Sequence, residues 1–126
     1  MEEAIREEFL RREITDHLPC AVAFDMARAL GVSPLEIGQA ADRMAVRLVK
    51  CQLGLFGYTP EKRIVKPSLS ASDDVKEAIT NGLRENRLPC KTAWQIALSF
   101  GLHKLKIAGF CDGLGVKIGP CQLGAF

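Results

Sequence analysis

The chain contains two copies of one segment. Residues 18–56 align with residues 88–126 without a gap, at a constant offset of 70 positions. A fixed internal period of this length marks a repeated structural unit. We therefore expect two units of the same fold, residues 1–58 and 73–126, joined by residues 59–72. Fifteen of the 39 aligned positions are identical, and in the first copy these are Leu18, Pro19, Cys20, Ala23, Ala27, Gly31, Leu35, Ile37, Asp42, Val46, Cys51, Gln52, Leu53, Gly54 and Phe56.

The length of the chain limits how independent the two units are. The whole chain has 126 residues, so each unit with its lead-in has only about 55, near the lower limit for a self-sufficient hydrophobic core. We therefore expect the two units to pack on each other, and the duplication suggests that they do so about a pseudo-twofold axis.

The composition excludes some classes of protein. With 48% hydrophobic and 25% charged residues, the chain is typical of a soluble globular protein. It has no apolar run long enough to span a membrane, and the acidic start Met1-Glu2-Glu3 does not resemble a signal peptide. We expect a cytoplasmic protein without a membrane partner. The net charge of +2 neither requires nor excludes a polyanionic partner.

Helical periodicity dominates the rest of the pattern. Apolar residues spaced as on one helix face predict amphipathic helices over residues 2–15 and 73–87. Pro19 interrupts this pattern because proline lacks a backbone N–H and restricts the residue before it. A short helix is expected next, over residues 21–30. Gly31 should end it, since glycine readily adopts the left-handed conformation of a helix C-terminus.

The helix that follows has a near-ideal start. Ser33 is placed to cap it, Pro34 suits the first helical position, and Glu36 completes a capping box. After that helix, the β-branched and partly alternating residues 46–51 predict a strand, and residues 63–66 are a candidate short strand. The predicted fold class is mainly α with short β elements, an α+β arrangement of duplicated units.

Residues 22–40 resemble a helix-turn-helix motif. That motif has an alanine midway along its first helix and a glycine four residues later, and Ala27 and Gly31 fill these positions. Ala97 and Gly101 fill them in the second copy. The apolar positions of the motif are also filled, by Met26, Leu30, Val32 and Ile37 in the first copy and by Ile96, Phe100, Leu102, Ile107 and Phe110 in the second. With the predicted strand, each unit looks like a winged helix, and residues 59–72 would be a linker or a wing.

The resemblance implies a transcriptional regulator that binds double-stranded DNA. In that superfamily the second helix of the motif enters the major groove, here Pro34–Met44 and Lys104–Leu114. Gln39 and Arg43 would then read base edges, and basic residues would hold phosphates. Asp42 and its counterpart in the second copy place a carboxylate on the same face, which opposes this use. The implied DNA contacts are Ser33, Gln39, Arg43, Arg47, Lys50, His103, Lys104 and Lys106.

The cysteines form a second conspicuous set. Four of the five are related by the duplication, Cys20 with Cys90 and Cys51 with Cys121, whereas Cys111 has no counterpart. Three interpretations are open: buried core residues, a zinc or iron–sulfur site made of the four repeated thiols, and redox-active or structural disulfides. Cys20 and Cys90 each follow a proline at a predicted helix start, a position that favours the thiolate. We expect each unit's two cysteines to be neighbours.

The remaining motifs leave the function open between classes. The pattern contains no catalytic motif, so we do not expect an enzyme. In the shared string Cys-Gln-Leu-Gly-x-Phe we expect Gln52 and Gln122 to bond to backbone. A DNA-binding regulator is the leading hypothesis. The alternatives are a metal- or redox-responsive accessory protein that uses the four repeated cysteines, and a scaffold that binds a protein partner or forms a homodimer.

Overall fold

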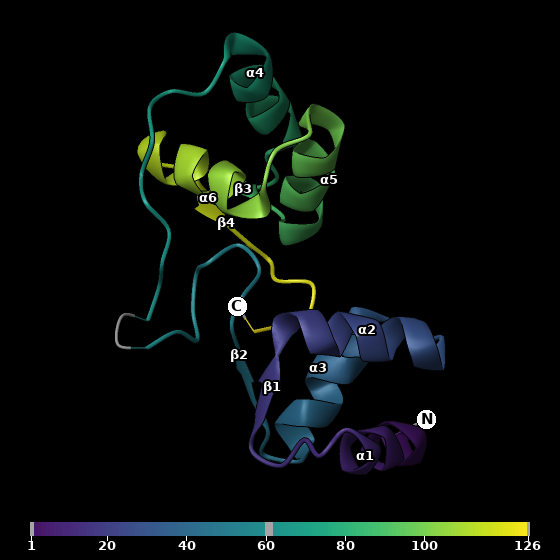
Figure 1. The fold of residues 1–126 in the computed structure, drawn as a ribbon. Helices are drawn as coiled ribbons and strands as arrows, with labels where there is room; N and C mark the ends of the chain where they lie inside the picture. Colours follow the sequence, from purple (N-terminus) through teal and green to yellow (C-terminus); the bar gives the residue numbers. More distant parts are fainter. Residues whose placement is uncertain (1, 60–61, 126) are drawn as a thin grey trace.

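The computed structural model describes residues 2–59 and 62–125, and these are mainly helical, in the predicted α+β class. The two repeats have the same order of elements (Figure 1). The first unit contains α1 (Glu2–Arg11), β1 (His17–Pro19), α2 (Cys20–Leu30), α3 (Pro34–Arg43) and β2 (Arg47–Val49). The second unit contains α4 (Asp73–Gly82), β3 (Arg87–Leu88), α5 (Cys90–Phe100), α6 (Lys104–Gly113) and β4 (Lys117–Ile118).

Local sequence signals place the helix ends. Gly31 and Gly101 adopt left-handed φ angles of 67° and 64° and end α2 and α5. Both bonds of the predicted capping box at Ser33 are present at the start of α3. By contrast, α1 and α4 are shorter than predicted. Glu13 is left-handed with φ 59° just after α1, and Leu83 is extended after α4.

Each unit contains one pair of short parallel strands. β1 pairs with β2, with His17 opposite Arg47, and β3 pairs with β4, with Arg87 opposite Lys117. This confirms the predicted strand after the second helix of each motif. The candidate strand at residues 63–66 was wrong, because within the described part of the chain that segment belongs to no strand or sheet.

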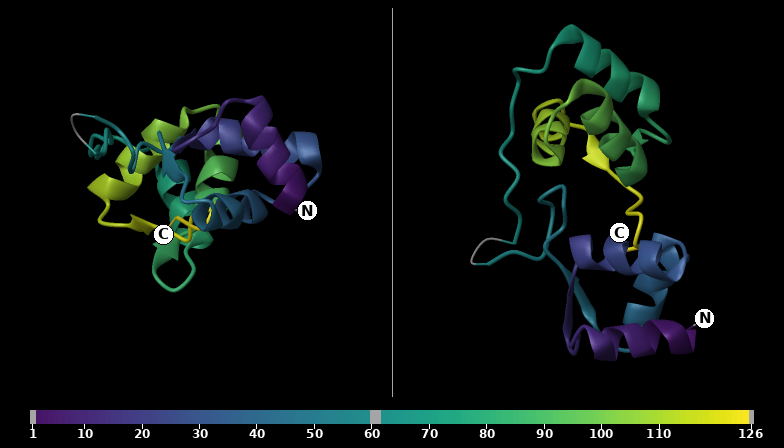
Figure 2. Two further views of the ribbon diagram at one scale, coloured as in Figure 1. Left: turned by 90° about the horizontal axis from the view of Figure 1, so that it is seen from below. Right: turned by 45° about the vertical axis from the view of Figure 1, so that its right-hand side comes forward.

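The two units exchange their C-terminal segments. We call residues 51–56 and 121–125 the first and second endings. Cys51 and Leu53 of the first ending belong to the hydrophobic core of the second unit. Leu123 of the second ending belongs to the core of the first. Figures 1 and 2 show the chain after β4 descending beside α2 and α3, while the chain after β2 rises towards the second unit.

Repeat-related contacts show that the exchange is symmetric. A Cβ on Gly54 would lie 2.3 Å from Leu105, and a Cβ on Gly124 would lie 2.9 Å from Leu35. These two contacts are equivalent under the offset of 70. The rings of Phe24 and its own counterpart Trp94 are in contact, with centroids 4.4 Å apart. A residue that touches its own counterpart lies on the axis relating the copies, so the geometry agrees with the expected pseudo-twofold arrangement.

Candidate functional site at the junction of the repeats

The predicted DNA contacts of the first unit lie largely on its surface. Gln39, Arg47 and Lys50 are exposed. The hydroxyl of Ser33 accepts a hydrogen bond from the Glu36 backbone at the start of α3. Arg43 donates from Nε to a carboxylate oxygen of Glu2 at 2.5 Å, and this bond lowers the pKa of Glu2. Arg43 is therefore already paired within the protein.

The predicted contacts of the second unit are engaged differently. The backbone N–H of Leu105 donates to Nδ1 of His103 at 3.1 Å, so His103 caps α6. Lys104 donates from Nζ to the side-chain oxygen of Gln52 at 2.8 Å and lies 3.7 Å above the centre of the Trp94 ring. Lys106 is exposed. Lys104 is thus held by the first ending, whereas Lys106 is free to meet solvent.

Most of α6 is covered by the protein itself. Its residues 107–111 are all buried. The connector runs along this helix, where the N–H of Ser68 donates to the carbonyl of Gly109 at 3.0 Å. A Cβ on Gly109 would lie only 2.6 Å from the carbonyl oxygen of Lys66. The second helix proposed to enter DNA therefore offers little exposed surface, whereas α3 keeps more exposed positions.

The four repeated cysteines come from equivalent places at the junction. Cys20 and Cys90 are the first residues of α2 and α5, and Cys51 and Cys121 begin the two endings. The first three are buried, Cys121 is half-buried, and all are free thiols. Cys111 is buried in the core of the second unit.

The electrostatics of these thiols show that they are neighbours. Burial raises the pKa of Cys20, and negative charge on Cys51 and Cys121 raises it further. Burial raises the pKa of Cys90 to about 11, and charge on Cys121 and Cys51 again adds to the effect. The predicted neighbourhood of Cys20 and Cys51 within one unit is confirmed. The interaction also extends across the two units, because the endings are exchanged.

Both glutamines of the repeated string contact sulfur rather than backbone, so our expectation for them was wrong. Gln52 donates from Nε2 to Sγ of Cys20 at 3.7 Å, and Gln122 donates likewise to Cys90 at 3.6 Å. The glutamines face the thiols because the two endings pass the starts of α2 and α5, where Cys20 and Cys90 lie. The only sequence signal for this role was the strict repetition of the string.

The other two thiols receive backbone donors. The N–H of Leu123 donates to Sγ of Cys121 at 3.4 Å. Backbone hydrogen bonds from Leu55, Leu53 and Gly54 act on Cys51 and partly offset the increase of its pKa by burial. The sulfurs of Cys20, Cys90 and Cys121 therefore each accept a hydrogen bond from an N–H group, and such donors favour the thiolate.

Two further features of the described residues concern metal binding and membrane spans. Within residues 2–59 and 62–125, no three His, Cys, Asp or Glu side chains are grouped closely enough to hold a metal ion as they stand. None of the helices in that part of the chain has the length and apolar character needed to cross a bilayer.

Comparisons with known proteins add no family. No protein-family model, curated protein or solved structure gives a significant match to this chain. The functional argument therefore depends on the residues and their geometry.

The buried thiols predict a loss of stability at alkaline pH. Burial, with a smaller contribution from Asp112, raises the pKa of Cys111 to about 12, whereas in the unfolded chain a thiol ionises near about 8.5. Between these values the unfolded state releases a proton that the folded state keeps, so the free energy of unfolding falls as pH rises. The fall is up to about 1.4 kcal/mol per pH unit for this thiol. Urea denaturation between neutral pH and about pH 10 should show a shallower decline for Cys111→Ala; equal slopes would contradict this assignment.

Proposed function

We propose that the four repeated cysteines form a thiolate site for a soft metal centre, and that the protein is a metal- or redox-responsive accessory protein. The observation that carries this proposal is the arrangement of Cys20, Cys51, Cys90 and Cys121. The exchange of endings brings four repeat-related cysteines to one junction, and three of the four sulfurs accept a hydrogen bond from an N–H group.

The junction of the four cysteines is electrostatically unfavourable for thiolates, which supports a cationic occupant. Burial and mutual repulsion both raise the pKa of Cys20 and of Cys90. A bound cation would offset both effects, because the thiolate is the ligand form. A core that merely used cysteine as a small apolar residue would have no need of hydrogen-bond donors to its sulfurs.

Of the two soft centres, an iron–sulfur cluster suits the arrangement better than one zinc ion. Zinc requires four sulfurs about 2.3 Å from a single point, and the described residues offer no such grouping. A cluster is also held by four cysteine thiolates, but it distributes them over several metal atoms and so accepts a wider spacing. Loading either centre requires the sulfurs to move inward from the positions described.

The test is to load the reduced, metal-free protein. One portion is titrated with cobalt(II), a spectroscopic substitute for zinc, and a second is supplied with iron and sulfide under anaerobic conditions. We expect thiolate charge-transfer absorption in at least one portion, with one centre per chain. If both portions stay colourless while an oxidant joins the thiols as disulfides, the metal assignment is overturned and the thiols act as a redox pair.

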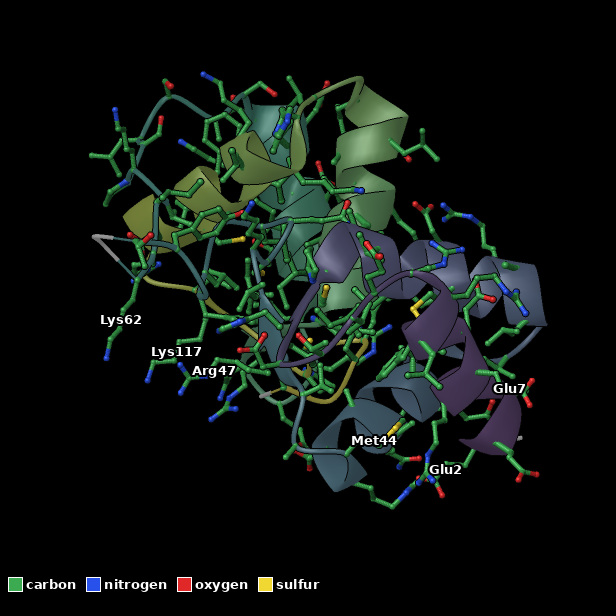
Figure 3. All side chains as sticks on the ribbon, turned by 60° about the horizontal axis from the view of Figure 1, so that its bottom comes forward. Glu2, Glu7, Met44, Arg47, Lys62 and Lys117 are labelled. Carbon is green, nitrogen blue, oxygen red and sulfur yellow. The ribbon has the colours of Figure 1, made fainter. Side chains whose placement is uncertain are left out.

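DNA binding is the second candidate, and the surface of the first unit favours it. Arg47 and Lys117 occupy equivalent positions at the starts of β2 and β4, and both are exposed. Figure 3 shows them projecting to the same side as Lys62, away from Glu2 and Glu7. Within the described residues none of these three cations has an ion-pair partner. In this candidate function Arg47, Lys62 and Lys117 hold phosphates, while the exposed side of α3 approaches the bases.

Salt-dependent binding to a duplex tests the second candidate. If Arg47 and Lys117 contact phosphates, changing both to alanine should weaken binding and lower the salt slope by about two, because each phosphate contact contributes about 0.9 to it. Arg28→Ala is the matched control, since Arg28 is exposed but paired with Asp25. DNA binding would be contradicted if no duplex binding were measurable at low salt. An unchanged salt slope in the double variant would contradict the assigned phosphate contacts.

A further inference from the structure

A cavity of about 450 Å³ lies beside the thiol site and is lined by both units. The first unit and its connector contribute three polar residues, and the second unit contributes the turn before α6 and its first residues. The lining residues are Lys50, Gln52, Tyr58, Leu102, His103, Lys104 and Leu105. Three of them, Lys50, His103 and Lys104, are among the residues implied as DNA contacts, and the structure brings these three to one small hollow.

The polar groups of this cavity are suited to an anion. Lys50 and Lys104 both line it, and no ion pair involves either lysine within the described part of the chain. None of the residues lining the cavity has a carboxylate. Because Nδ1 of His103 accepts a hydrogen bond, its imidazole carries the proton on Nε2 and has a donor left. The cavity therefore combines two ammonium groups and an imidazole N–H with no opposing charge.

The duplication shows that these cationic groups occur at only one of two repeat-related places in the molecule. The counterparts of Lys50, His103 and Lys104 are Pro120, Ser33 and Pro34. The pseudo-twofold arrangement therefore has this combination of charges on one side only. A role in packing alone would be expected at both places, because the packing itself is repeated.

We propose that this cavity binds the phosphate group of a small molecule. Lysine binds phosphate as a point charge, and two lysines from different units can hold one group between them. The size of the cavity suits a free phosphorylated compound rather than a nucleic-acid backbone. The cavity also adjoins the thiol site, because Lys104 holds the oxygen of Gln52 while the nitrogen of Gln52 donates to Cys20.

The test uses the reduced, metal-free full chain, so its outcome does not depend on whether a metal centre forms. Isothermal titration with pyrophosphate, inorganic phosphate and citrate is compared for the wild type, Lys50→Met, Lys104→Met and Lys106→Met. We expect pyrophosphate to bind best, with each of the first two variants about tenfold weaker or more, since each removes one charge-assisted contact. Lys106→Met is the control, because Lys106 lies on the same helix but does not line the cavity.

Four results would overturn this proposal. The first is no heat of binding for pyrophosphate at millimolar concentration. The second is unchanged affinity in both Lys50→Met and Lys104→Met; Lys50→Met alone decides the matter if the other variant fails to fold by circular dichroism. The third is binding of a short duplex that depends on Lys50 and Lys104 while pyrophosphate is not bound, which would assign the cavity to backbone phosphate. Tighter binding of citrate than of pyrophosphate would likewise replace phosphate with carboxylate as the ligand group.

Discussion

Gly38→Ala should destabilise the protein by roughly 2–4 kcal/mol, which is the usual range for overpacking combined with loss of a buried leucine. Gly38 lies in α3, where a Cβ would be 1.8 Å from the carbonyl oxygen of Leu123. The obstacle is backbone, so it cannot be relieved by a side-chain rotation. The second ending must move away from α3, and Leu123, which is 2% exposed, must leave the core of the first unit. Urea denaturation measures the effect.

Comparison of the two copies explains why we expect this loss of stability at Gly38 and not at the equivalent position of the second copy. The counterpart of Gly38 is Ala108, a buried residue that already carries a methyl group. The helix itself therefore accepts alanine here, and only the exchanged ending excludes it. Gly82→Ala is the matched control, since a Cβ there meets only the side-chain atoms of Thr92 and Leu88. If Gly38→Ala is as stable as the wild type, or gains the ~1 kcal/mol typical of alanine in a helix, the ending does not pack against α3.

The second large effect is expected at the sulfurs of the endings. Cys51→Ser and Cys121→Ser should each weaken metal binding by about 100-fold or more, because loss of a ligand exceeds the 10–100-fold typical of losing an outer-shell partner. Gln52→Leu removes such a partner from Cys20 and should fall within that lower range. Affinity is measured by competition with a chelator of known strength.

Cys111 provides the control for this series. Like Cys20, Cys51 and Cys90 it is buried, but it has no repeat counterpart and lies in the core of the second unit. Cys111→Ser should leave metal affinity unchanged, although it can lower stability. Equal losses in Cys111→Ser and Cys51→Ser would mean that the variants act through folding and not through ligation.

Local structure was predictable because its causes are local. Pro19 and Gly31 mark the start and the end of α2 through their own backbone restrictions, and the cap at Ser33 depends on residues within one turn. The wrong predictions arose where the structure depends on residues that are distant in the sequence. Nothing within residues 63–66 tells whether a partner strand is present, and that segment lies outside any ladder.

The arrangement of the site depended on long-range packing that the pattern does not encode. The apolar character of Leu53 and Leu123 indicated burial but not in which unit. For the same reason Lys104 was expected on a DNA-facing surface, whereas it is held by Gln52 from the other unit. The informative signal was the concentration of identity in Cys-Gln-Leu-Gly-x-Phe, which five of six residues share between copies. An ordinary packing segment would have allowed apolar substitutions there.

The most direct test of the central claim is the metal content of protein purified without oxygen. Iron, sulfide and zinc are quantified per chain, and an absorption spectrum is recorded for the wild type and for the double variant Cys51→Ser, Cys121→Ser. The account predicts one metal centre per chain in the wild type, with iron–sulfur absorption favoured over colourless zinc, and its loss in the double variant. A folded wild-type protein that contains neither iron nor zinc and takes up neither on reconstitution would contradict the account.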